Sequence, residues 1–162
     1  MDNKKKQNAV LAFLDEYKKA IIELKNVILD LNENELLEVV DNETLNPECK
    51  SIQSILTHVV SSGFSYCIYI QNHRNIDSKR PEQKFRTSIA QYSNDLDNVL
   101  EFTNKTFSDI FDSELEEFSE SRKIATKWGQ FYDIEQMMEH AIIHILRHRR
   151  QIGNFKKKIR GV

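Results

Sequence analysis

Apolar residues recur at three- and four-residue intervals along four long stretches of this sequence, and no other feature constrains the fold as strongly. The stretches run from about Gln7 to Leu31, from Ser51 to about Asn72, from Thr87 to Ile110, and from Tyr132 or Asp133 to about Lys157. No alternation of apolar and polar residues indicates a β-strand, and only 4 Gly and 2 Pro interrupt the chain. We therefore predict an all-α fold, a four-helix bundle that forms one domain over residues 1–162.

Two of the connections between these helices are long. Residues 73–85 are polar and contain Pro81, which predicts a loop. Residues 111–131 end in Trp128-Gly129, a bulky apolar anchor followed by a turn residue. Connections of this length permit a bundle in which successive helices do not simply alternate in direction, and periodicity does not decide the topology.

Three of the five histidines, His140, His144 and His148, are spaced by four residues in the last predicted helix. On a helical wheel, His148 falls within the core-facing arc, His144 lies at its edge, and His140 lies further round. Two imidazoles four residues apart have Cα atoms about 6 Å apart and can share one ion, whereas three span about 12 Å and cannot. We therefore predict that, if a metal ion is bound here, His144 and His148 bind it together. His140 is then expected beside these two residues or in a pocket wall.

A third candidate ligand, His58, lies on the flank of the apolar stripe of the second predicted helix. Ser62 and Tyr69 share this flank, so a polar seam borders the core face. Gly63 falls within the stripe and would let a neighbouring helix approach closely. Histidines on a helix face are often only packed and hydrogen-bonded. The pair in the last helix therefore does not by itself decide between a metal site and a purely structural role. His58 completes a set of three nitrogens and favours a metal site.

Other side chains near the seam are candidates for a pocket. Gln151 falls on the histidine face and could orient a ligand or a bound water. Tyr66, Tyr69 and Trp128 could form a wall, although packing into the core is the alternative for each of them. Glu139 lies on the opposite face of its helix and no H-E-x-x-H motif is present, so the sequence shows no obvious general base and argues against metalloprotease chemistry.

These motifs resemble those of the DinB/YfiT-like superfamily of predicted metalloenzymes. The resemblance covers nearly the whole chain, because the number, order and spacing of the helices agree with that family. The matching motifs are Ser51-Ile52-x-x-Ile55-Leu56-x-His58 in the second helix and His144-x-x-x-His148-Arg149-x-Gln151-Ile152 in the last.

The resemblance implies an up-down-down-up bundle with a short added segment in the long connection. It also implies a divalent metal held by His58, His144 and His148, the residues that the wheel and the seam select. Some members of the family resemble transferases or isomerases that use mycothiol or bacillithiol.

A site of three imidazoles leaves one coordination position open for water or substrate. We expect zinc or nickel, with iron or manganese as alternatives, since such a site does not select one metal. The expected function is a metal-dependent reaction on a small molecule, foremost a transfer that uses a low-molecular-weight thiol. A metal-dependent hydrolase and a non-catalytic metal-binding or interaction protein are the alternatives.

Composition excludes several other classes of partner. The net charge is -2 and the helices show no basic face, which argues against nucleic acid. No apolar run is long enough to span a membrane and no signal peptide is recognisable. Cys49 and Cys67 form no disulfide framework, so we expect a reduced, cytoplasmic protein. Ile143, with Leu146 towards the same side, faces away from the core arc, so a homodimer is as well supported as a monomer.

Overall fold

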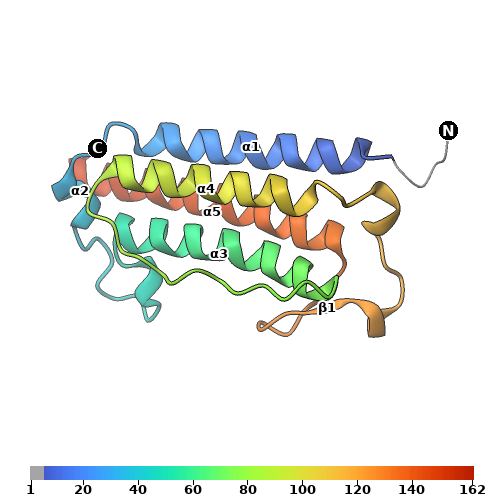
Figure 1. Ribbon diagram of the computed structural model, residues 1–162. Coiled ribbons are helices and arrows are strands. Elements are labelled where there is room, and N and C mark those ends of the chain that lie inside the picture. The colour runs from blue at the N-terminus through green and yellow to red at the C-terminus, as the bar shows by residue number, and fades with distance from the viewer. Residues whose placement is uncertain (1–5) are drawn as a thin grey trace.

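Four long helices pack side by side in the computed structural model, which describes residues 6–162 (Figure 1). They confirm the four predicted helices and the mostly helical fold. Helices α1 and α3 each pack against both α4 and α5. The bounds are α1 (Asn8–Ile28), α3 (Ile52–His73), α4 (Ile89–Phe107) and α5 (Ile134–Arg160).

Helices α1 and α5 run in one direction along the bundle, and α3 and α4 run in the other (Figure 1). Because α3 and α4 are consecutive long helices with the same direction, residues 74–88 must return along the bundle; we call them the return segment. Hydrogen bonds tie this segment to α3 along its length. The amide of Ser78 donates to Asn72 Oδ1 (3.0 Å), Arg80 Nη1 donates to Ser65 Oγ (3.3 Å), and Gln53 Nε2 donates to the Arg86 carbonyl (2.9 Å).

Side-chain caps fix where the two histidine-bearing helices begin. Ser51 caps α3, as predicted, by accepting a hydrogen bond from the amide of Ser54. Asp133 caps α5 and forms a capping box with Gln136. Gly161 ends α5 in the left-handed conformation (φ 69°), which a glycine adopts without steric cost. The caps set the register of His58, His144 and His148 relative to the core.

Several short elements were not predicted. The prediction of an all-α fold holds for the long elements, but β1 (Ile124–Ala125) and β2 (Phe131–Tyr132) add a small antiparallel hairpin. Strands of two residues are too short to show an alternation of apolar and polar side chains. Gly129 occupies the turn between them, as expected, with φ +84°. Within residues 6–162 the structure also has a short helix, α2 (Glu33–Leu37), and 3-10 turns at Pro47–Cys49, Asp112–Glu114 and Glu120–Arg122.

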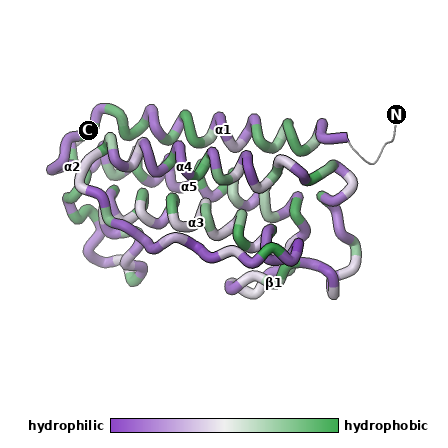
Figure 2. Tube along the Cα trace, viewed as in Figure 1, coloured by the Kyte–Doolittle hydropathy of each residue, from purple (hydrophilic) through white to green (hydrophobic). Residues whose placement is uncertain are grey.

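Apolar residues occur along all four long helices, whereas the return segment is mostly hydrophilic (Figure 2). Among residues 6–162, no helix combines the length and the apolar character that crossing a bilayer requires. On α5, Ile143 is 62% exposed, as predicted, but Leu146 is partly buried against the core. The homodimer therefore stays a prediction, supported on this face by Ile143 alone.

The close approach predicted at Gly63 is confirmed. A Cβ atom at Gly63 would lie 2.5 Å from Val99 Cγ1 and 3.2 Å from the Tyr17 hydroxyl, so both α4 and α1 come close to α3 here. Val99 is β-branched and buried on a helix, which leaves it little freedom to rotate away.

Gly63→Ala is therefore expected to lower the free energy of unfolding by about 1–3 kcal/mol, because overpacking outweighs the gain in helix propensity. Gly153→Ala is the matched control, since Gly153 lies within α5 and nothing lies within 4 Å of its added Cβ. We expect this control to raise stability by about 0.5–1 kcal/mol. Urea unfolding of both variants measures the difference, and equal stability changes would contradict the close packing.

Candidate metal centre

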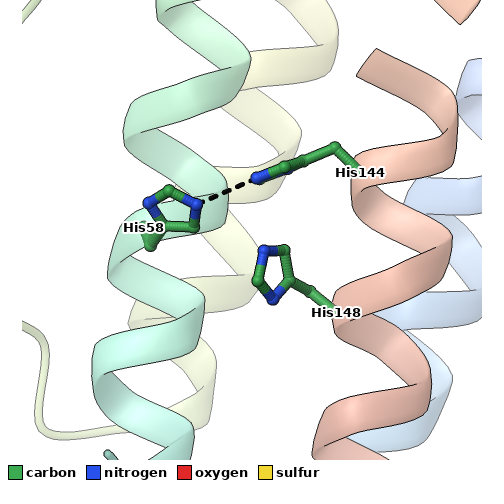
Figure 3. A group of neighbouring side chains, drawn as sticks. All are labelled: His58, His144 and His148. Atoms are coloured by element: carbon green, nitrogen blue, oxygen red, sulfur yellow. Dashed lines mark hydrogen bonds between the residues drawn. The ribbon is translucent and has the colours of Figure 1, made fainter. Parts of the chain in front are cut away.

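His58 from α3 and His144 and His148 from α5 meet between the two helices (Figure 3). One candidate ligand atom from each ring lies within 4.8 Å of the other two. The ring centroids are 4.8 Å apart for His58 and His144, 5.1 Å for His58 and His148, and 4.4 Å for His144 and His148. The structure thus brings together the three histidines that the sequence selects, while His73 is exposed.

Burial favours the neutral, metal-binding form of the two imidazoles on α5. His148 is only 6% exposed, as the wheel predicts, and burial lowers its pKa. Burial, aided by the nearby His148 and His58, lowers the pKa of His144 to about 2. A neutral imidazole presents an unprotonated nitrogen to an ion without first losing a proton.

Two of the rings are oriented by hydrogen bonds at Nδ1. His148 Nδ1 lies 2.9 Å from Gln151 Oε1, and His58 Nδ1 lies 2.9 Å from Glu48 Oε2. Because each oxygen accepts the Nδ1 proton, the Nε2 atom of each ring keeps its lone pair. Gln151, expected to orient a ligand or a water, therefore orients His148.

His144 has a different environment. Its Nδ1 atom is buried without a hydrogen-bond partner among the described residues. Its Nε2 lies 2.9 Å from Nε2 of His58 (Figure 3). Two lone pairs facing each other at this distance would repel, so a proton or a cation must lie between them. A divalent ion that accepts all three lone pairs removes this conflict, and the donor set fits such an ion.

Glu48 is the residue of this site that sequence reasoning missed. It lies in the 3-10 turn Pro47–Cys49, where Asn46 Oδ1 accepts a hydrogen bond from its amide (3.0 Å). The only signal was its position in "NPECKS", immediately before the cap of α3. In the same turn, Cys49 Sγ lies 4.0 Å from Gln151 Oε1. This turn therefore supplies the group that orients His58 and contacts the group that orients His148.

A cavity of about 660 Å³ opens beside the three histidines. Its wall includes the pocket residues predicted from the sequence except Gln151, which contacts His148 instead. Tyr66 is both buried in the core and part of the wall, and its burial raises the pKa of its hydroxyl. The lining residues are His58, Ser62, Ser65, Tyr66, Ile68, Tyr69, Asn72, Arg80, Lys127, Trp128, His140 and His144.

His140 belongs to this wall rather than to the three-histidine cluster. Trp128 stacks on it with ring centroids 5.1 Å apart and planes 20° apart. Its Nδ1 lies 3.3 Å from the Tyr132 hydroxyl, and burial lowers its pKa. Trp128 and Tyr132 both come from the hairpin region, so the hairpin closes the pocket at this side.

No protein-family model matches the chain, and no curated protein matches it either.

His148→Ala is expected to lose more metal than His140→Ala. His148 lies in the core, where water replaces a missing ligand poorly, whereas His140 stacks on Trp128 and is not among the three residues that could hold one ion. Metal content per protein chain, measured on both purified variants after loading, checks this. Equal metal content would show that His148 is not a ligand.

Glu48→Gln is expected to weaken metal affinity about tenfold, because the carboxylate fixes the tautomer of His58 and increases its basicity. Glu43→Gln is the matched control, since Glu43 is exposed in the same connection and contacts no histidine. Competition with a chelator of known affinity measures both variants. A loss of the same size in the control would mean that only the overall charge matters.

Proposed function

We propose that this protein is a DinB/YfiT-like metal-binding enzyme that acts on a small molecule, foremost by transferring or adding a low-molecular-weight thiol. One observation carries the proposal: the imidazoles of His58, His144 and His148 turn toward one another, and His58 and His144 line an open pocket. A purely structural ion is normally enclosed by four protein ligands, whereas a catalytic one keeps a position facing a cavity.

Topology supports the family assignment. The directions of α1, α3, α4 and α5 in Figure 1 are those of an up-down-down-up bundle. The residues of the two motifs also have identifiable tasks. Ser51 caps α3, Gln151 supports His148, and Arg149 pairs with Glu23 of α1.

His58, His144 and His148 would hold the ion, with zinc or nickel expected first and iron or manganese as alternatives. When bound, a divalent ion supplies a positive charge that favours the deprotonated form of a thiol or a water beside it. The chain itself contributes the rest. Burial keeps His144 and His148 neutral, Glu48 and Gln151 hold two rings in position, and the pocket admits and orients the substrate.

The composition of the pocket wall favours a thiol over water as the nucleophile. No carboxylate is among the lining residues in the described part of the chain, and the carboxylate of Glu48 is engaged by His58. A free thiol has a pKa of about 8.5, much closer to neutrality than that of water, so it depends less on a general base. The raised pKa of Tyr66 keeps its hydroxyl protonated, so it acts as a hydrogen-bond donor rather than a base.

The test combines elemental analysis with a panel of small thiols and 1-chloro-2,4-dinitrobenzene. In the expected reaction a carbon–sulfur bond forms, the carbon–chlorine bond breaks, chloride leaves, and the thiol proton goes to solvent. We expect metal-loaded protein to form the thioether, and both chelated protein and His144→Ala to lose this activity. Metal added back to chelated protein should restore it.

Two results would replace the proposal. If every thiol is inert but a nitrophenyl ester is hydrolysed only by metal-loaded protein, the enzyme is a hydrolase. If neither reaction occurs and X-ray absorption shows four protein ligands around the ion, the site is structural and the protein is not an enzyme.

A further inference from the structure

The pocket beside the three histidines contains two cations. Arg80 comes from the return segment and Lys127 from the hairpin region, and both belong to the pocket lining. No salt bridge among the described residues includes either side chain. The lining includes no carboxylate, so nothing within the wall neutralises the two charges.

Arg80 differs in this respect from Arg86, which belongs to the same segment. Arg86 forms two hydrogen bonds with the carboxylate of Asp95, at 2.8 and 2.9 Å, and this pair anchors the end of the return segment to α4. Arg80 instead donates to the neutral hydroxyl of Ser65, at 3.3 Å. The hydroxyl positions the guanidinium at the pocket but leaves its charge and its other donors available.

Lys127 is held at the pocket through its backbone. Its amide donates to the Tyr69 hydroxyl, at 3.1 Å, and the next residue, Trp128, stacks on His140. These contacts fix the hairpin tip against the pocket wall while the ammonium group makes no hydrogen bond or salt bridge among the described residues.

The positive charge is local, because the whole chain has a net charge of -2. The protein therefore does not attract anions over its whole surface, and the two cations act at this pocket. Aromatic side chains of Tyr66, Tyr69 and Trp128 provide an apolar wall beside them. Such a combination of apolar walls with a few polar groups is typical of small-molecule sites of this volume.

We propose that the pocket selects a small molecule that carries a carboxylate, with its anionic group bound by Arg80 and Lys127 and its apolar part against the aromatic wall. This inference rests on the proposed function, since the ligand would be a substrate of the same centre. Binding of the carboxylate nevertheless depends on the two cations and does not require the metal. The two proposals can therefore fail separately.

The test uses full-length, metal-free protein and two matched probes, 3-phenylpropionate and its neutral amide. Trp128 is the only tryptophan and lines the pocket, so its fluorescence reports on binding. We expect the acid to bind about tenfold more tightly than the amide. Arg80→Gln and Lys127→Gln should each weaken the acid roughly three- to fivefold and leave the amide unchanged, as exposed charge pairs imply. The preference should shrink in about 1 M salt, where charges are screened.

Lys79→Gln is the matched control, because it removes the same charge from the residue next to Arg80 but Lys79 does not line the pocket. Equal affinity for acid and amide, failure of both to bind, or an equal loss in the control would each overturn the inference. If the acid is preferred but the protein neither binds metal nor transfers thiols, the inference stands and the proposed function fails. If thiol transfer occurs without any preference for the acid over the amide, the proposed function stands and the inference about the carboxylate fails.

Discussion

Three imidazole rings face one another between α3 and α5, and the geometry of the site depends on how their buried charge and lone pairs are balanced. Protonating His144 or His148 would place a cation where water reaches poorly, which explains why burial lowers the pKa of both. At the same time Nε2 of His58 and Nε2 of His144 lie 2.9 Å apart, where two lone pairs would repel unless a proton or a cation lies between them. A divalent ion satisfies both conditions, since it needs neutral ligands and draws their lone pairs together.

This arrangement requires a close and rigid packing of helices. Gly63, five residues beyond His58 on α3, lets α4 and α1 approach the helix that carries this candidate ligand. The caps at Ser51 and Asp133 fix the two helices along their axes, and the turn with Glu48 fixes the ring of His58. Helix packing therefore sets the distances between the ligands, and short polar contacts at the helix starts set their orientation.

The parts that sequence predicted well are those governed by helical periodicity. The wheel placed His148 in the core, His144 at its edge and His140 further round, because one rotation of about 100° per residue applies along a whole helix. Glu48, Arg80 and Lys127 were missed for a common reason. Each lies in a connection, where the direction of a side chain depends on individual turns and on contacts with residues distant in sequence. The hairpin strands, at two residues each, also lack a readable period.

The division between helices and connections has a consequence for how such a protein could be redesigned. The candidate ligands belong to α3 and α5, whereas the charged groups at the pocket come from the return segment and from the residues next to β1. A library of variants confined to residues 76–82 and 126–130 would therefore change the charged groups at the pocket and leave the positions of the three candidate ligands unchanged. Under the proposed function, this separation would make the bundle a scaffold on which new substrate preferences can be selected without changing the candidate ligands.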